Sequence, residues 1–212
     1  MLPVIETFVS IQGESTHAGR RCFFIRLAGC NLRCNYCDTP YAWQGGTLTA
    51  VDELTAAAVN SGTEIVEVTG GEPLIHDETV ILLRKLLDAG LEVLLETNGS
   101  VDISGVPPAV RKILDCKTPG SLMAEKNLFT NYQFLQKHDE IKFVVTSKDD
   151  FNWSLQVIEK YKLAEKTANL IFSPVWGAVG FEELAQWVVE CGKPVRMQLQ
   201  MHKLIWGDRK GV

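Results

Sequence analysis

The chain has 212 residues, 46% of them hydrophobic and 22% charged, and its 21 Lys and Arg against 26 Asp and Glu give a formal net charge of −5. This length suits one α/β domain, because α/β barrels often run to about 200–250 residues as a single domain. The mild acidity argues against a nucleic-acid partner, and no apolar run approaches the roughly 18 residues of a membrane span, so we expect neither nucleic acid nor membrane as a partner.

Apolar runs with β-branched residues alternate with segments of helical period, which predicts parallel βα units. The predicted strands are 21–27, 64–69, 91–96, 111–116, 140–145, 169–172 and 194–199, and the predicted helices are 50–61, 77–89, 127–137, 149–164 and 180–191. Thr49 with Asp52 resembles a capping box, and Gly62 and Gly90 follow helices as C-terminal caps do. We expect one α/β domain over residues 1–212, with functional loops after the strand carboxyl ends.

Six cysteines are the unusual feature of this composition. The N-terminus has neither the basic nor the apolar region of a secretory signal, so we expect a cytoplasmic protein whose thiols stay reduced. There, clustered cysteines more often indicate metal binding or catalysis than disulfides. The cysteines outside the cluster, which we interpret as packing residues, are Cys22, Cys116 and Cys191.

The other three, Cys30, Cys34 and Cys37, form a C-x3-C-x2-C pattern directly after the first predicted strand. Three thiolates on one short loop can bind one inorganic centre. Structural zinc normally takes four protein ligands, and no local fourth ligand is present. A [4Fe–4S] cluster held by three cysteines leaves one iron open to a small molecule. A zinc site with a distant fourth ligand and an incidental grouping remain the alternatives.

The cysteine pattern resembles the signature of the radical S-adenosylmethionine (SAM) superfamily, and Thr69-Gly70-Gly71-Glu72-Pro73 after the next strand resembles its second motif. The resemblance implies a partial (β/α) TIM-like barrel with the cluster at the mouth. It also implies that the open iron chelates SAM, that the glycines expose backbone groups to it, and that Glu72 meets its ammonium group. Without the cysteine loop, Gly70-Gly71 would be read as a simple turn.

Further segments resemble one family of that superfamily, the 7-carboxy-7-deazaguanine synthases. They are Gln12-Gly13-Glu14, Arg26 to Leu32, Cys37-Asp38-Thr39, Thr69 to Pro73, Glu96-Thr97-Asn98-Gly99 and Gln200-Met201-His202-Lys203. The family converts 6-carboxy-5,6,7,8-tetrahydropterin to 7-carboxy-7-deazaguanine with loss of ammonia, using SAM catalytically, in queuosine and deazapurine biosynthesis. The resemblance therefore implies a lyase with a [4Fe–4S] cluster, SAM and Mg²⁺.

The resemblance also assigns site residues. The implied substrate-binding residues are Ile11, Gln12, Gly13, Glu14, Arg26, Thr69, His202 and Val212. The residues implied to border SAM are Tyr36, Cys37, Asp38, Gly70, Gly71, Glu72, Glu96, Asp115, Cys116, Lys117, Ser173, Pro174 and Val175. The hydroxyl of Thr39 is implied to bind Mg²⁺, which prefers hard oxygen ligands and keeps several waters. The segment Phe172 to Trp176 departs from the family pattern.

Within that assignment, Glu14 would accept hydrogen bonds from the pterin N–H groups, and Arg26 would bind its carboxylate with two parallel N–H groups. Each has a plainer alternative. Arg26 alone would be read as a surface charge, Thr39-Pro40 as a turn, Glu96 to Gly99 as a capped turn, and Val212 as part of a frayed tail.

We expect a flavodoxin or ferredoxin-type electron donor, and a homodimer that covers apolar edges of the shortened barrel. A glycyl-radical activating enzyme shares the cysteine loop and the glycine motif, but Gln12-Gly13-Glu14 and the segment Gln200 to Lys203 argue against it. An iron–sulfur electron carrier or a zinc-binding module would need neither Gly70-Gly71-Glu72 nor Arg26.

Overall fold

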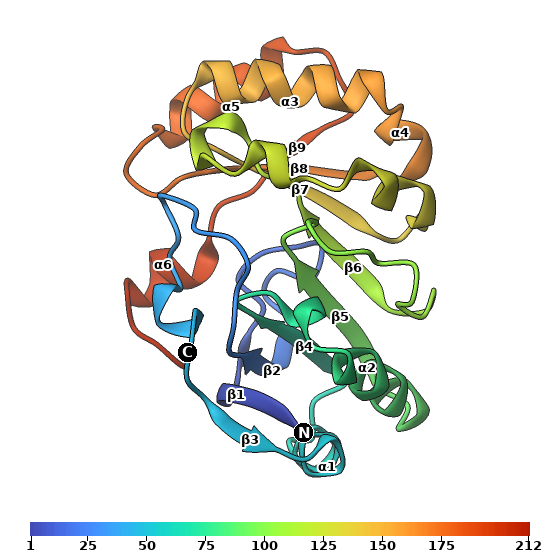
Figure 1. Cartoon of the computed structure of the whole chain (residues 1–212). Helices are drawn as coiled ribbons and strands as arrows, with labels where there is room; N and C mark the ends of the chain where they lie inside the picture. The colour runs from blue at the N-terminus through green and yellow to red at the C-terminus, as the bar shows by residue number, and fades with distance from the viewer.

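Nine strands form one curved, open sheet in the computed structural model, which describes all 212 residues (Figure 1). The strand order is β3-β1-β2-β4-β5-β6-β7-β8-β9. The strand bounds are β1 (Leu2–Ile11), β2 (Arg21–Leu27), β3 (Thr47–Thr49), β4 (Ile65–Gly70), β5 (Glu92–Thr97), β6 (Arg111–Asp115), β7 (Glu140–Val145), β8 (Asn169–Pro174) and β9 (Arg196–Met197). From β2 to β9 the pairs are parallel, whereas β1 pairs antiparallel with β2 and β3.

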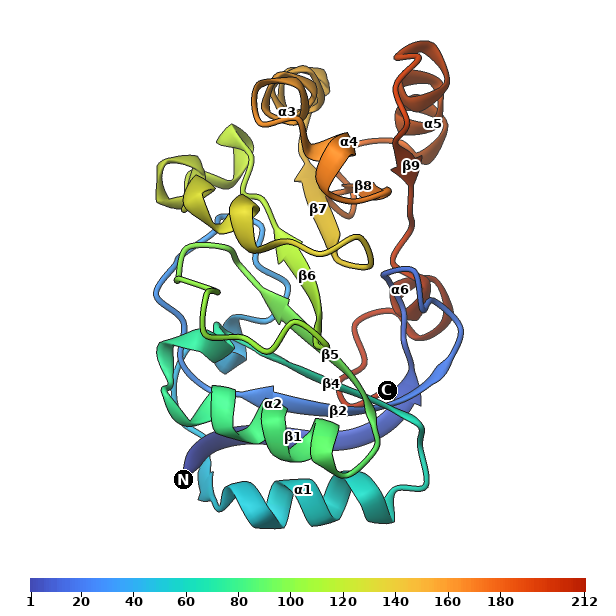
Figure 2. The ribbon, with the colours of Figure 1, turned by 90° about the vertical axis from the view of Figure 1, so that its right-hand side faces the viewer.

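Helices cover the outer face of this sheet, except for the last one, which lies beside the loop after β1 (Figure 2). The helix bounds are α1 (Val51–Asn60), α2 (Glu78–Asp88), α3 (Lys148–Lys160), α4 (Leu163–Lys166), α5 (Phe181–Glu190) and α6 (Met201–Trp206). A core of 34 buried residues lies between sheet and helices, where Phe151 of α3 packs on Phe172 of β8 and Trp187 of α5. No helix combines the length and the apolar character needed to cross a bilayer. The architecture is the expected partial α/β barrel.

The alternation of side chains along each strand separates an apolar outer face from a mixed inner face. On β4, Val66 and Val68 pack into the helix-covered core, whereas Glu67 and Thr69 point into the barrel and line its cavity. The same parity puts Arg26 of β2 inside. Polar side chains thus gather inside the barrel, whereas the apolar side chains whose burial stabilises the fold lie between the sheet and the helices.

The parallel strands and most helices are confirmed, and the element boundaries differ by a few residues. The last strand, predicted as 194–199, is only two residues long, at Arg196–Met197. The antiparallel strands β1 and β3 were not among the predicted elements. Both extend the sheet beyond β2, and β3 pairs with β1 through only three residues.

The predicted helix over 127–137 is wrong, because this stretch forms a 3-10 segment at Phe129–Phe134. The fully buried Asn131 donates to the carbonyls of Gly99 and Val101 and accepts from the backbone N–H of Ile103. These hydrogen bonds pair buried backbone groups of the loop at 99–103, which would lack these partners if 127–137 formed a regular helix. The expected capping box is also wrong, because no side chain caps α1.

Both predicted glycine caps are confirmed. Gly62 and Gly90 have φ values of +65° and +81° after α1 and α2, in the left-handed region that glycine adopts without strain.

The gap between β9 and β1 is bridged by the loop after β1 and by the C-terminal segment. Gln198 donates from its side-chain amide to the carbonyl of Ser15 at 2.6 Å, and the backbone N–H of Met201 donates to the carbonyl of Gly13 at 2.9 Å. Figure 2 shows α6 between β9 and the β1–β2 hairpin. Helix α6 therefore lies across the opening that an unclosed barrel leaves.

One buried ion pair supports the outer core. The ammonium group of Lys112 lies 2.9 Å from the carboxylate of Asp139, and both side chains are almost fully buried. We expect Lys112→Met to lower the free energy of unfolding by about 3–5 kcal/mol, because Asp139 would stay buried without its cation. Urea unfolding measures this change. The exposed Lys166→Met is the matched control and should shift stability by less than about 0.5 kcal/mol; equal effects of the two variants would contradict the assignment.

Candidate active site

A cavity of about 590 Å³ opens at the carboxyl ends of the strands. Its wall combines the cysteine loop after β2, the inner face of the parallel strands, the loop after β1 and the C-terminal tail. Loops at this end of a parallel barrel carry the functional groups in enzymes of this architecture. The cavity therefore lies where the sequence placed the site.

The cysteine loop is held against the end of β4 by two close backbone approaches. The N–H of Gly71 donates to the carbonyl of Leu27 at 3.1 Å, and the N–H of Glu72 donates to the carbonyl of Gly29 at 2.7 Å. A Cβ atom on Gly71 would lie 2.1 Å from the Gly29 oxygen, and one on Gly70 would lie 2.1 Å from the Leu27 oxygen. Only glycine fits at these two positions.

Cys30, Cys34 and Cys37 all line the cavity as free, half-buried thiols. Burial raises the pKa of Cys30 and of Cys34, so their thiolates need a bound cation nearby. No three thiol, imidazole or carboxylate groups converge on a point that one metal ion would fill. A [4Fe–4S] cluster does not need that geometry, because each of its irons takes one thiolate. Three free thiols on one loop, facing one cavity, are the donor set that such a cluster takes.

Glu72 of the glycine motif is fully buried and does not line the cavity. Its carboxylate accepts hydrogen bonds from the hydroxyl of Thr97 at 2.8 Å, from the N–H of Leu74 at 3.0 Å and from the N–H of Asn98 at 2.6 Å. Burial raises the pKa of Glu72 to about 6 against these donors. In this geometry Glu72 joins the ends of β4 and β5 and presents the backbone of Gly70 and Gly71 to the cavity.

At the end of β6, Lys117 pairs with Asp115 at 2.7 Å, and both side chains line the cavity. The second carboxylate oxygen of Asp115 is buried and has no hydrogen-bond partner. Such an unpaired buried acceptor is costly unless a ligand supplies a donor. A polar ligand with N–H or O–H groups, as SAM has, fits this wall.

Cys116 is fully buried behind this wall, where the hydroxyl of Tyr132 donates to its sulfur at 3.2 Å. Cys116 therefore packs in the core, as the sequence indicated, and it does not reach the cavity wall, where the resemblance had placed it beside SAM. Ser173 and Pro174 of β8 are also outside the lining, although the buried hydroxyl of Ser173 has no partner; Val175 does reach the cavity. The predicted SAM-bordering residues that do line the cavity are Tyr36, Cys37, Asp38, Gly70, Gly71, Glu96, Asp115, Lys117 and Val175.

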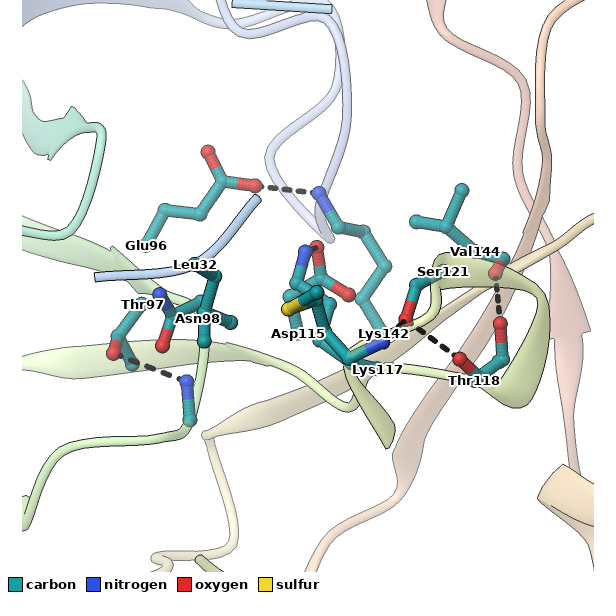
Figure 3. A network of polar contacts seen from close by, with 12 residues as sticks. Leu32, Glu96, Thr97, Asn98, Asp115, Lys117, Thr118, Ser121, Lys142 and Val144 are labelled. Carbon is teal, nitrogen blue, oxygen red and sulfur yellow. Dashed lines mark hydrogen bonds and ion pairs between the residues drawn. The ribbon is translucent and has the colours of Figure 1, made fainter. Parts of the chain in front are cut away.

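Lys142 of β7 lies at the centre of the cavity's charges. Its ammonium group is 3.0 Å from the carboxylate of Glu14 and also pairs with Glu96, as Figure 3 shows for the latter. Thr69 donates to the second oxygen of Glu96 at 3.0 Å. Although burial opposes ionisation of Glu96, Lys142 and Thr69 lower its pKa.

The sequence reasoning missed Lys142 and Glu67, which both line the cavity. Each is a charged residue flanked on both sides by apolar residues of a parallel strand, Ile141 and Phe143 beside Lys142, and Val66 and Val68 beside Glu67. Parallel strands covered on both faces usually read as continuous apolar runs. Charges that interrupt such a run are the signal that marks an inner-face site.

Arg26 presents part of its guanidinium group to the cavity. Its Nε donates to Glu6 at 2.8 Å, and its guanidinium carbon lies 6.0 Å from the ring centres of Phe8 and of Tyr41. The two terminal nitrogens make no hydrogen bond within the protein, while the side chain is only 17% exposed. These nitrogens are placed to bind an anion through two parallel hydrogen bonds.

Thr39 lies at the rim of the cavity, and its hydroxyl donates to Asp38 at 3.0 Å. Asp38 in turn pairs with Lys203 of α6 at 3.1 Å. Burial alone would raise the pKa of Asp38, but the pKa falls to about 2 because the ammonium group of Lys203 is close. This ion pair ties α6 to the cysteine loop.

The C-terminal tail folds over the cavity. Gln200 donates to Glu14 at 3.0 Å, the ammonium group of Lys210 lies 4.1 Å from the ring centre of Tyr41, and Val212 is among the lining residues. All of the predicted substrate-binding residues share this one cavity: Ile11, Gln12, Gly13, Glu14, Arg26, Thr69, His202 and Val212.

Comparisons with known proteins agree with this geometry. The family model described as the radical SAM superfamily matches residues 24–188. A 7-carboxy-7-deazaguanine synthase of Chlorobaculum tepidum is 42% identical over all of this chain and 97% of its own length, and one of Clostridium acetobutylicum is 40% identical over 98% of this chain and 97% of its own length. The crystal structure of QueE from Escherichia coli shares the fold, with a TM-score of 0.76 at 23% identity over 95% of this chain and 94% of that one.

The position of the tail depends on Gly13. A Cβ atom there would lie 2.2 Å from Nδ1 and 2.9 Å from Cγ of the His202 ring. We expect Gly13→Ala to displace His202 and to speed hydrogen exchange and proteolysis of residues 201–212. Gly105→Ala, where a Cβ would meet open space, is the matched control. Unchanged exchange in the tail of the Gly13→Ala variant would show that this contact does not hold it.

Proposed function

The chain belongs to the 7-carboxy-7-deazaguanine synthase family of the radical SAM superfamily, and we propose that its cavity converts 6-carboxy-5,6,7,8-tetrahydropterin to 7-carboxy-7-deazaguanine with loss of ammonia. One observation carries the proposal: the cysteine loop and the unpaired terminal nitrogens of Arg26 line the same cavity. A cluster with SAM and a carboxylated substrate would therefore share one enclosed space. The product is a precursor for queuosine or another deazapurine.

Cys30, Cys34 and Cys37 would hold the [4Fe–4S] cluster, and its open iron would take SAM. When bound, cluster and SAM supply a one-electron reduction that yields a hydrogen-abstracting radical. The chain's own residues provide position and shelter for this chemistry. The backbone at Gly70 and Gly71 lies next to the cysteine loop, and the unpaired Asp115 oxygen offers an acceptor farther along the wall.

Two charged residues would orient the substrate from opposite sides. Arg26 would bind the pterin carboxylate through its two terminal nitrogens, because a charge-assisted bidentate contact fixes both place and angle. Glu14 would accept hydrogen bonds from the pterin N–H groups, and its ion pair with Lys142 at 3.0 Å would hold its carboxylate at the cavity wall. The tail from Gly207 to Val212 would cover the bound substrate and exclude water, which protects a reactive radical.

We assign Mg²⁺ to the hydroxyl of Thr39, together with substrate oxygens and waters. The support is chemical: Mg²⁺ accepts a site with one protein ligand when substrate oxygens and waters complete its shell. The neighbouring Asp38 is already paired with Lys203, so Thr39 would act as the sole protein ligand.

The remaining partners are proposals of the same kind. A flavodoxin or ferredoxin-type protein in the cytoplasm would supply the electron, because the cluster must be reduced before it acts on SAM. A second copy of the chain would cover exposed apolar residues near the barrel opening, where Leu204 and Ile205 of α6 are 51% and 54% exposed.

Anaerobic reconstitution tests the function. The protein loaded with iron and sulfide should convert the carboxypterin to 7-carboxy-7-deazaguanine when SAM, reductant and Mg²⁺ are present. Most of the SAM should remain intact, and the conversion should be slower without Mg²⁺.

Cys34→Ala should lose the visible absorption of the cluster and SAM cleavage together, because one ligand is missing. Cys191→Ala, remote from the cavity, is the matched control. A cluster-replete wild-type sample that yields no deazaguanine would refute the proposal.

Arg26→Ala tests the carboxylate contact. We expect its iron content and SAM binding to match the wild type, while kcat/KM for the carboxypterin falls by about 10- to 100-fold, because a charge-assisted hydrogen-bond pair is lost. Arg21→Ala changes an exposed arginine on the same strand and should have no such effect. An unchanged apparent KM in the Arg26→Ala variant would count against this role.

A further inference from the structure

Glu67 is a carboxylic acid on the apolar floor of the cavity. On β4 it pairs in register with Phe24 of β2 and Leu94 of β5, two residues before the level at which Arg26 pairs with Thr69. Its side chain is almost fully buried, at 2% exposure, yet it lines the cavity. The apolar residues clustered at this floor are Cys22, Phe24, Ile65, Leu94 and Ile113.

No cation pairs with Glu67. Lys142, the ammonium group of this region, is engaged by Glu14 and Glu96, and Arg26 pairs with Glu6. An ionised Glu67 would add a third carboxylate near one lysine, on a side chain that is almost fully buried. Burying an unpaired carboxylate is far more costly than burying the neutral acid.

The titratable and charged groups that face Glu67 come from every surrounding element: Cys22 and Arg26 of β2, Glu96 of β5, Lys142 of β7 and Glu14 of the loop after β1. Burial is the main reason that the pKa of Glu67 lies well above its usual range. Glu96 and Glu14 raise it further, and Lys142 and Arg26 offset only part of the rise.

The hydrogen bonds of Gln12 leave one carboxyl oxygen of Glu67 for the cavity. The side-chain amide of Gln12 donates to Oε2 of Glu67, and its oxygen accepts from the N–H of Glu14 at 2.8 Å. The other oxygen of Glu67 has no partner within the protein. If the proton resides on this oxygen, the floor presents an O–H donor beside the acceptor Glu14.

We propose that Glu67 is a specificity-determining residue whose neutral carboxyl group donates a hydrogen bond from its cavity-facing O–H to the ring carbonyl of the bound pterin. A pterin edge carries N–H donors next to a carbonyl acceptor. Glu14 would accept hydrogen bonds from the N–H groups, and Glu67 would donate one to the carbonyl. The assignment of the ligand rests on the proposed function, whereas the protonation of Glu67 does not.

Infrared spectroscopy tests the protonation without any turnover. The difference spectrum of wild type minus Glu67→Gln at neutral pH should contain the C=O stretch of a protonated carboxylic acid. Carboxylate bands in its place would overturn the proposal. This measurement gives its answer even if the carboxypterin proves not to be the substrate.

Kinetics test the donor role. Glu67→Gln keeps a neutral donor and acceptor, so we expect it to retain kcat/KM within about threefold, whereas Glu67→Leu should raise the KM for the carboxypterin about tenfold with unchanged cluster content. As pH rises, Glu67 loses its proton and its donor, so the wild-type kcat/KM should fall on the alkaline side. Glu67→Gln should lack this fall, and the exposed Glu64→Gln should keep it.

Two outcomes would overturn the donor role. If Glu67→Gln lowered kcat/KM for the carboxypterin as much as Glu67→Leu does, an ionised carboxylate would be required. A Glu67→Leu variant with the wild-type KM and pH profile would mean that the side chain does not contact substrate. If the wild type itself forms no product, the proposed function fails first, and binding of the carboxypterin to the cluster-loaded variants decides whether Glu67 recognises this ligand.

Discussion

The close approach of the cysteine loop to the end of β4 is the constraint on which the site depends. Gly71 leaves no space for a side chain against the carbonyl of Gly29, and the N–H of Glu72 bonds to that same carbonyl. The buried Glu72 then ties this corner to β5 through Thr97 and Asn98. Cluster ligands and the backbone that would meet SAM are thus held on one rigid corner, which a reactive radical site requires.

The electrostatics of the cavity follow from a shortage of cations inside the barrel. Lys142 pairs with both Glu14 and Glu96 and, although burial opposes the ionisation of Glu96, it lowers the pKa of that group. Glu67 has no ion-pair partner on its apolar floor. Arg26 keeps its terminal nitrogens free because Glu6 takes only its Nε. The site therefore offers carboxylates as acceptors and a guanidinium group for an anion, in a cavity that the C-terminal tail lines.

Part of this structure was predictable because local patterns carry it. The parallel strands β2 and β4 to β8 follow from apolar runs, and the cysteine and glycine motifs identified the end of the barrel that holds the cavity. The helix predicted over 127–137 was wrong because Asn131 forms hydrogen bonds with the buried backbone of the loop at 99–103. Helical periodicity does not reveal such contacts between distant parts of the chain. Glu72 carries the motif, yet its contacts are structural in this geometry.

The sequence by itself determined the order of βα units, the three cysteines on one loop and the segment Gln12-Gly13-Glu14, because each is a pattern of residues close together in the chain. Only the tertiary structure decided which charged side chains, from which strands, line the same cavity. Glu67 and Lys142 are 75 residues apart, and their inward direction and unequal pairing depend on sheet register and curvature. The C-terminal segment is a similar case. Val212 lines the cavity, and the residues before it, Gln200, Met201 and Lys203, contact Glu14, Gly13 and Asp38, which no local pattern records.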